Sequence, residues 1–274
     1  MASFVFPLLK GKTAAITGGT TGIGRAISLE YIRQGCNVAV NHLGFPHDAN
    51  LRSSLLEEAA RIREESKSEE KYMAGEMIDV KGDVTSTADC KNLVQEAVDR
   101  WGKLDVFVAN AGIFKPAPFL ELEESQVEST MRTNLHGCFY ACQAAARQMV
   151  KQGHGGSIIG ISSISALQGG RFQTHYTPTK AGILSLMQSM AVALGEHNIR
   201  CNALLPGTIN TQLAAEEIGN EVSRKKLEAK IALGRAGEAR EIAGPAVFLA
   251  NDAMSSFVTG AGLLADGGMY AYLQ

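Results

Sequence analysis

The chain lacks the features that mark several specialised classes of protein. It has only 7 prolines, with 45% apolar and 20% charged residues, so extensive disorder is not expected. The apolar run at positions 4–9 is interrupted by Pro7 and is too short to span a membrane. The five cysteines are dispersed, at Cys36, Cys90, Cys138, Cys142 and Cys201. This pattern fits neither a disulfide framework nor a zinc site, and it predicts a reducing, cytoplasmic compartment and no bound metal.

A broad basic surface is also missing. The formal net charge is −2 and the isoelectric point is near 6.3, so we expect no nucleic-acid partner, and any phosphate site must be local. The one biased segment, 57–71, carries charges of both signs opposite an apolar stripe, as solvated helices do. No internal repeat or linker appears, so we expect one domain over residues 1–274.

Apolar strands alternate with helical segments along most of the chain. The expected strands cover residues 12–17, 37–41, a segment ending at Asp83, 104–109, 157–162, 200–205 and 263–265. The expected helices follow the first strand and then cover residues 49–68, 86–101, 126–150, 175–196 and 238–250. This alternation predicts an α/β protein with a doubly wound parallel sheet, helices on both faces, and ligands outside the carboxyl ends of the strands.

Three glycines follow the first predicted strand and open the next helix. Gly18, Gly22 and Gly24 lack side chains, which lets the backbone turn sharply and approach a pyrophosphate at a helix N-terminus. Their spacing differs from the more familiar Gly-x-Gly-x-x-Gly, and a glycine turn of either kind is weak evidence by itself. Their place between a strand and a helix nevertheless favours a dinucleotide site.

Polar or small residues also stand where other predicted strands end. Asp83-Val84 offers a carboxylate to an adenine amino group. Asn110-Ala-Gly112 would let a ribose and a nicotinamide pass close by, and Pro206-Gly-Thr-Ile-Asn-Thr211 offers backbone groups to a carboxamide. Taken singly, each segment is equally well explained as an ordinary strand-exit turn.

Tyr176 and Lys180 lie four residues apart in a predicted helix. Positions i and i+4 share a helix face, so the Lys180 ammonium can approach the Tyr176 phenol. A neighbouring cation favours an ionised phenol, which makes such a tyrosine a candidate base near neutrality. The same spacing occurs on many helices without catalytic meaning, so the pair gains weight only from its neighbours in the sequence.

Taken in order, these motifs resemble those of the classical short-chain dehydrogenase/reductases. The resemblance runs from about Leu9 to the C-terminus and includes the glycine motif, Asn-Ala-Gly, Asn134, Ser163, Tyr176, Lys180 and the Pro-Gly turn. It implies a Rossmann-type sheet of about seven strands and chemistry on a nicotinamide cofactor. By analogy with the family, a homotetramer is expected.

The resemblance also implies roles for individual residues. Tyr176 would be the general base in oxidation, Lys180 would lower its pKa and hold the nicotinamide ribose, and Ser163 would bind the reacting oxygen. Asn134, a poor helix former, would complete a relay by holding a water between Lys180 and solvent. The implied cofactor residues are Gly18, Thr20, Thr21, Gly22, Ile23, Gly24, Asn41, His42, Asp83, Val84, Asn110, Ala111, Gly112, Tyr176, Lys180, Pro206, Gly207, Ile209 and Thr211.

The end of the second predicted strand bears on the choice between NAD and NADP. A carboxylate there would bond the ribose 2′-hydroxyl, and an arginine would accept a 2′-phosphate. Asn41 and His42 do neither, and the glycine turn carries Thr20 and Thr21 in place of a basic residue. We therefore expect both cofactors to be used.

A polar cluster at the end of the fifth predicted strand indicates the substrate. Ser162, Ser163 and Ser165 stand there, and Gln173, His175, Tyr176 and Thr208 are expected to face the same cleft. Buried hydrogen-bonding groups of this kind favour a polyhydroxylated substrate. The segments 155–167 and 173–182 resemble fungal aldose 1-dehydrogenases, which implies oxidation of a cyclic sugar at C1. Ala166 and Arg171-Phe172 depart from the pattern of many relatives and leave the exact sugar open.

Other activities share the same motifs. A reductase of ketones or 3-oxoacyl thioesters would have every catalytic residue in common and differ only in its pocket. The substrate loop is expected at about 207–234. Its charged part, 212–233, includes Arg224, Lys225 and Lys226, and is expected to be mostly solvated, with closure over substrate or contact with an acidic acyl carrier as alternatives. A non-catalytic cofactor sensor would tolerate loss of the tyrosine, which this chain retains.

Overall fold

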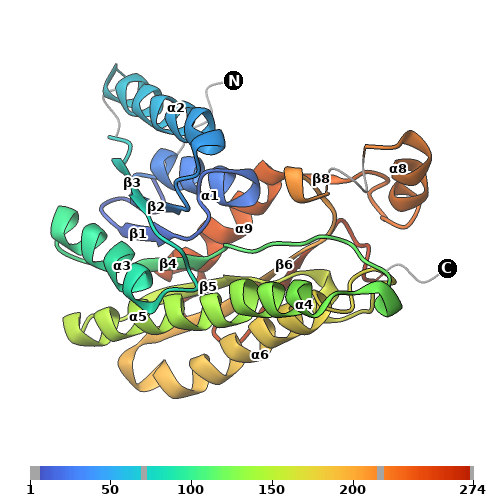
Figure 1. Ribbon diagram of the computed structural model, residues 1–274. Helices are drawn as coiled ribbons and strands as arrows, with labels where there is room; N and C mark the ends of the chain where they lie inside the picture. Colours follow the sequence, from blue (N-terminus) through green and yellow to red (C-terminus); the bar gives the residue numbers. More distant parts are fainter. Residues whose placement is uncertain (1–6, 69–72, 215–218, 272–274) are drawn as a thin grey trace.

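A parallel sheet forms the centre of the molecule (Figure 1). The structure is a computed structural model that describes residues 7–68, 73–214 and 219–271. The sheet has seven strands in the order β3-β2-β1-β4-β5-β6-β9, and every neighbouring pair is parallel. The strands are β1 (Thr13–Ile16), β2 (Asn37–His42), β3 (Met77–Lys81), β4 (Val106–Ala109), β5 (Gly156–Ile161), β6 (Ile199–Pro206) and β9 (Gly262–Ala265). The predicted fold class is confirmed.

Helices cover both faces of this sheet. One layer packs around α1, α2 and α9 and the other around α3, α5 and α6, and each layer encloses its own apolar core. Among the described residues, no helix combines the length and apolar character needed to cross a bilayer. The helices are α1 (Gly22–Arg33), α2 (Ala49–Ser68), α3 (Thr87–Trp101), α4 (Glu124–Thr130), α5 (Gly137–Gln152), α6 (Thr177–Leu194), α8 (Glu221–Glu228), α9 (Ala239–Ala250) and α10 (Asp252–Ser255).

The order of the strands fixes where a ligand can bind. Every residue of β1, β4 and β6 is buried, as expected for strands covered on both faces. The chain starts at β1, builds outward to β3, and then continues on the other side of β1 with β4. In open α/β sheets the crevice lies outside the carboxyl ends of the strands at this switch point, which here is the end of β1 and β4.

Several expected elements have different boundaries in the structure, and two of these differences lie close to the cavity. β3 ends at Lys81 and not at Asp83, because the Asp83 N–H donates to Asp89 Oδ2 at 2.8 Å and the chain already turns toward α3. The helix expected at 126–150 is two helices, α4 and α5, joined by a π-helical turn at Met131–His136. Such turns often mark functional positions, and Asn134 lies in this one.

The segment expected as a substrate loop contains regular structure. β7 (Ile209–Asn210) pairs in parallel with β8 (Gly237–Glu238). Asn220 caps the start of α8, and its Oδ1 accepts from the Val222 N–H at 2.9 Å. The residue pattern did not predict these elements because each strand has only two residues and α8 is strongly charged.

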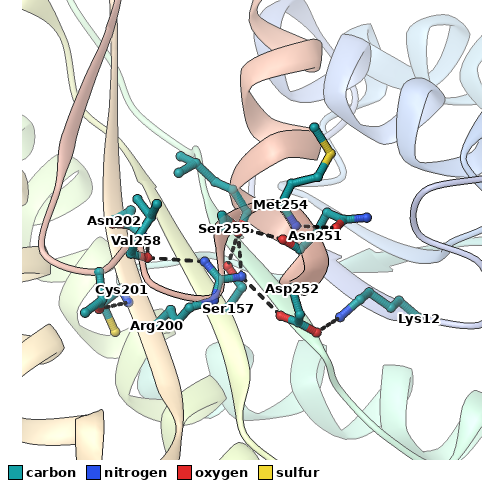
Figure 2. A network of polar contacts seen from close by, with 12 residues as sticks. Lys12, Ser157, Arg200, Cys201, Asn202, Asn251, Asp252, Met254, Ser255 and Val258 are labelled. Atoms are coloured by element: carbon teal, nitrogen blue, oxygen red, sulfur yellow. Dashed lines mark hydrogen bonds and ion pairs between the residues drawn. The ribbon is translucent and has the colours of Figure 1, made fainter.

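A polar network ties the amino ends of the strands to the end of α9 (Figure 2). Arg200, near the start of β6, donates to the Leu249 carbonyl at 2.8 Å, the Val258 carbonyl at 3.3 Å and Asp252 Oδ1 at 3.2 Å. Asp252 also pairs with Lys12, which precedes β1. The network therefore holds β1 and β6 against the connection between α9 and α10.

We expect Arg200→Met to lower the free energy of unfolding by about 2 kcal/mol. A hydrogen bond from a charged donor contributes about 1.5–3 kcal/mol. The loss is limited because the Leu249 and Val258 carbonyls keep donors, from Ser157 Oγ and Asn202 Nδ2. Urea unfolding followed by circular dichroism measures the change.

Arg61→Met is the matched control for this substitution. Arg61 lies on the exposed side of α2, and its nitrogen is 4.0 Å from Glu65. An exposed pair of this kind should change stability by less than about 0.5 kcal/mol. Equal losses in the two variants would contradict a special role for the Arg200 network.

Candidate active site

A cavity of about 990 Å³ opens at the carboxyl ends of the central strands. Its walls come from the glycine turn after β1, the ends of β2, β4, β5 and β6, the first turn of α6 and the segment around α8. All the cofactor residues expected from the sequence line it except Gly24, and so do the expected substrate residues Ser163, Ser165, Gln173, Tyr176 and Thr208.

The glycine turn is shaped to hold a phosphate group. Gly18 has φ 60° and Gly22 has φ 52°, in the left-handed region that favours glycine. α1 begins at Gly22, Thr21 makes no side-chain cap, and the first turn holds no acidic residue. The N-terminal N–H groups of α1 are thus left for an anion, and the turn fits the pyrophosphate of a dinucleotide.

Gly24 has a different role from the one expected. It is buried one turn inside α1, where an added Cβ would come within 2.3 Å of the Gly18 carbonyl oxygen and 2.5 Å of Asn110 Nδ2. The absence of a side chain lets α1 pack against the turn. Gly24 therefore shapes the site without lining it.

Asn110 holds the same turn from the neighbouring strand. Its Nδ2 donates to the carbonyls of Thr17 and Gly18, both at 3.0 Å, and its backbone N–H donates to Thr17 Oγ1 at 2.9 Å. Next to it, Gly112 leaves room beside Lys180, since an added Cβ would lie 3.8 Å from Nζ. The Asn-Ala-Gly segment thus joins the glycine turn to the reacting end of the cavity.

Tyr176 and Lys180 meet in the middle of the cavity wall. Tyr176 directly precedes α6 and is 8% exposed, and its ring packs against Phe114 with the centroids 4.8 Å apart. Lys180 Nζ lies 5.4 Å from the Tyr176 ring centroid and donates to the Ile161 carbonyl at 2.9 Å. The Lys180 ammonium therefore lies close to the Tyr176 ring.

Burial makes the Lys180 ammonium easier to deprotonate. The residue is 5% exposed, and this burial lowers its pKa to about 8, with Cys138 acting weakly in the opposite direction. An unfolded lysine binds its proton up to a pKa near 10.4. Between these values the unfolded chain binds more protons than the folded one, so the folded state gains stability as pH rises and loses it as pH falls toward 8.

We expect Lys180→Met to remove this pH dependence in the cofactor-free protein. The wild type should gain about 2 kcal/mol relative to the variant between pH 7.5 and 9.5, because the cost of burying the charge disappears. Urea unfolding of both proteins at the two pH values measures it. A stability difference that is the same at both values would contradict a lowered pKa.

All three serines of the cluster line the cavity, but their hydroxyl groups have different partners. Ser163 Oγ accepts from the Ser165 N–H at 3.1 Å, and Ser165 Oγ donates to Gln173 Oε1 at 2.9 Å. These three residues present polar groups to the cavity. Ser162 Oγ instead donates to the Lys180 carbonyl at 2.7 Å, so its hydroxyl fastens α6 to β5.

Two expected residues lie behind the cavity wall. Asn134 is fully buried, donates to the Ile113 carbonyl at 2.9 Å and accepts from the Ile113 N–H at 2.8 Å. His175 is 2% exposed and does not line the cavity, contrary to expectation. Burial lowers the pKa of His175, and its ring stacks on Phe114 with the centroids 6.0 Å apart. His175 therefore supports Phe114, which in turn packs on Tyr176.

The structure adds residues that the motifs did not predict. They include Leu43, Phe45, Asp48, Phe114 and Met269 and, within the expected substrate loop, Gln212, Leu213, Ala214, Ser223, Lys226, Leu227 and Lys230. The amphipathic pattern of α8 was the one signal for its cavity face. Arg224 and Lys225 pair with Glu228 and Glu221 on the helix surface, as expected for solvated charges, while Lys226 lines the cavity.

Comparisons with known proteins agree with this geometry. The family model described as enoyl-(acyl carrier protein) reductase matches residues 18–270. A relative from Scheffersomyces stipitis, named L-rhamnose-1-dehydrogenase, is 52% identical over 97% of this chain and 99% of its own length. A relative from Sphingomonas sp., named L-rhamnose 1-dehydrogenase (NAD(P)(+)), is 48% identical over 97% of this chain and 99% of its own.

A solved structure has a similar fold. The crystal structure of a short-chain type dehydrogenase/reductase from Mycobacterium marinum has a TM-score of 0.85 and 33% identity, over 95% of this chain and 96% of that one. The agreement of fold, motifs and relatives shows that the chain belongs to the short-chain dehydrogenase/reductase family.

Proposed function

We propose that this enzyme oxidises the C1 hydroxyl of a cyclic aldose, L-rhamnose in the first place, to the aldonolactone with NAD⁺ or NADP⁺. The dehydrogenase chemistry rests on Tyr176, Lys180 and Ser163 lining one cavity with the glycine turn. The observation that carries the choice of sugar is the name shared by the relatives from Scheffersomyces stipitis and Sphingomonas sp.. Their similarity covers nearly the whole chain, including the cavity walls.

Tyr176 acts as the base in the proposed reaction. Its phenolic oxygen accepts the proton of the C1 hydroxyl, while the C1–H bond breaks and a C1–O double bond forms. The nicotinamide, when bound, supplies the acceptor for the two electrons and the hydrogen that leave C1. Packing against Phe114 fixes the Tyr176 ring, and the Lys180 ammonium stabilises the phenolate. Ser163 Oγ donates to the reacting oxygen.

The proton leaves Tyr176 by way of Lys180 and Asn134. The π-helical turn holds Asn134 against the Ile113 backbone, on the inner side of the cavity wall. Gly112 separates the two polar groups, since a Cβ there would lie 3.3 Å from Asn134 Oδ1 and 3.8 Å from Lys180 Nζ. We infer that a water between them passes the proton toward solvent.

The polar wall suits a substrate with several hydroxyl groups. Ser165 and Gln173 are hydrogen-bonded to each other at 2.9 Å, which orients both side chains at the cavity surface. Thr208 lines the opposite wall, after β6. A substrate lacking hydroxyls would offer no partner for the remaining hydrogen-bonding capacity of these groups, and this penalty favours a sugar over a simple ketone.

Both cofactors are accepted in this proposal. The Asn41 side chain already has a partner within the fold, since its Nδ2 donates to the Gly82 carbonyl at 2.8 Å. Neither Asn41 nor His42 offers a carboxylate that would exclude a phosphate. Catalytic efficiencies with NAD⁺ and NADP⁺ test the point. A preference beyond about a thousandfold, roughly 4 kcal/mol, would contradict dual use.

We also propose a homotetramer in the cytoplasm, each subunit folding as one domain over residues 1–274. Assembly through α5 and α6 is supported by exposed apolar side chains on these helices, with Phe139 45%, Val150 39% and Val192 87% exposed. All five cysteines are free, in keeping with a reducing compartment. Light scattering on the purified chain measures the number of subunits.

A panel of sugars with each oxidised cofactor tests the activity. We expect L-rhamnose to give the highest catalytic efficiency, measured by the absorbance of the reduced cofactor. Reduction of simple ketones and 3-oxoacyl thioesters should be much slower, because these substrates have fewer hydroxyl groups to bond with Ser165, Gln173 and Thr208. Fast thioester reduction without sugar oxidation would favour the reductase alternative.

A further inference from the structure

A second cavity, of about 220 Å³, adjoins the large one beside the end of β2. The two share Thr20, His42, Phe45 and Asp48 in their walls. In this fold the end of the second strand faces the ribose of the adenosine half of the cofactor. The smaller cavity therefore lies where the 2′ substituent that distinguishes NADP from NAD has to fit.

Polar side chains from three elements meet beside this cavity. The His42 side chain, on β2, is 6% exposed, and its Nε2 lies 3.0 Å from Asp79 Oδ2 on β3. Arg52, on α2, lines the cavity, and its Nε lies 3.6 Å from the same Asp79 oxygen. Figure 1 shows α2 next to the outer strands β2 and β3. One carboxylate oxygen thus faces two nitrogen donors.

The position of the carboxylate distinguishes this arrangement from an NAD-selective site. An acid at the end of β2 would face the ribose hydroxyls and repel a 2′-phosphate. Here Asp79 stands on the neighbouring strand and contacts both His42 and Arg52. A second acid, Asp48, lines both cavities after the end of β2, and its Oδ1 lies 3.6 Å from His47 Nε2. Neither the glycine turn nor β2 supplies an arginine, and Arg52 is the cavity's guanidinium.

Arg52 is free enough to change partners. Its side chain is 41% exposed, and its contact with Asp79 at 3.6 Å is a loose ion pair. A phosphate carries more charge than a carboxylate and accepts two parallel hydrogen bonds from a guanidinium. An exposed pair contributes little to stability, so exchanging Asp79 for a phosphate costs little.

We propose that Arg52 selects the 2′ substituent of the cofactor, with Asp79 as its competing partner. Arg52 binds the 2′-phosphate of NADP and remains paired with Asp79 when the ribose carries a hydroxyl. In the second state His42, which lines both cavities and contacts the same Asp79 oxygen through Nε2, stands beside the ribose hydroxyl. This exchange rests on the proposed function and gives dual cofactor use a physical basis.

Binding of the adenosine half alone tests the assignment without catalysis. Calorimetric titration of the full chain with 2′,5′-ADP and with 5′-ADP compares the two substituents directly. We expect Arg52→Met to weaken 2′,5′-ADP binding about 10- to 100-fold, as loss of a bidentate charged contact does, and to leave 5′-ADP binding nearly unchanged. Asp79→Asn should strengthen 2′,5′-ADP binding severalfold, because the competitor for Arg52 loses its charge. Arg61→Met, on the exposed side of the same helix, should change neither.

The outcomes separate this inference from the proposed activity. Equal weakening of both ligands by Arg52→Met, or no change in either, would overturn it, and so would 2′,5′-ADP binding that falls in Asp79→Asn. A wild-type chain that bound neither ligand would also overturn it. If the ligands respond as expected but no sugar is oxidised, the inference stands and the proposed substrate is wrong. If L-rhamnose is oxidised but Arg52→Met leaves the preference between 2′,5′-ADP and 5′-ADP unchanged, the proposed function stands and this inference is wrong.

Discussion

Tyr176→Phe should lower kcat for sugar oxidation by about 10³-fold or more, because it removes the one atom proposed to take the C1 hydroxyl proton. The substitution keeps the ring, so the contact with Phe114 at 4.8 Å and the burial of the side chain are preserved. Binding of the reduced cofactor, measured by its fluorescence, should change little. Initial rates with L-rhamnose and saturating cofactor give kcat.

Tyr140→Phe is the matched control. Tyr140 lies half-buried on α5 beside His136 and Phe139, outside the cavity wall. Loss of its hydroxyl should leave kcat close to the wild-type value. Turnover by Tyr176→Phe at the wild-type rate would refute the proposed base, and a parallel loss of cofactor binding would show that the hydroxyl acts in binding and not in proton transfer.

The second large effect is expected from Gly24→Ala. The added methyl group would lie 2.3 Å from the Gly18 carbonyl oxygen, so either α1 or the glycine turn must move. Overpacking of this kind costs about 1–3 kcal/mol of stability. The displaced turn should weaken NAD⁺ and NADP⁺ binding on the order of a hundredfold, equivalent to about 3 kcal/mol. Thermal unfolding and cofactor titration measure the two effects.

Gly195→Ala controls for the change from glycine to alanine itself. Gly195 is exposed at the end of α6 with φ −59°, and an added Cβ meets nothing within 4 Å. It should leave cofactor binding unchanged and raise stability by up to about 1 kcal/mol, because alanine restricts the unfolded chain. If Gly24→Ala behaved in the same way, the packing role of Gly24 would be wrong.

Local patterns carried most of the fold prediction. Buried strands such as β1 and β4 consist mostly of apolar residues in short runs. The 20-residue helix α2 was expected at its observed bounds because an apolar stripe repeats along it. The site motifs were equally readable, since each lies directly after a strand and parallel strands end at the same edge. The predicted element boundaries were wrong where a side chain of another element binds the backbone, as Asp89 does after the end of β3.

Local residue patterns did not predict the orientation of the side chains. His175 was expected in the cleft beside Tyr176, yet consecutive residues before a helix point in different directions, and packing on Phe114 buries it. Gly24 belongs to the glycine motif but meets Gly18 and Asn110 instead of the cavity. α8 reaches the cavity through Lys226 and Leu227 although its composition resembles a solvated helix.

The sequence by itself determined the family, the order of strands and helices and the residues placed at the strand ends, because these depend on neighbours within a few positions. The tertiary structure decided which side chains face the cavity. It alone brought His42, Arg52 and Asp79 together from β2, α2 and β3. The physical reason is that such a cluster depends on the packing of a helix across two strands. The spacing of residues along the chain does not predict the distance between residues that only folding brings together.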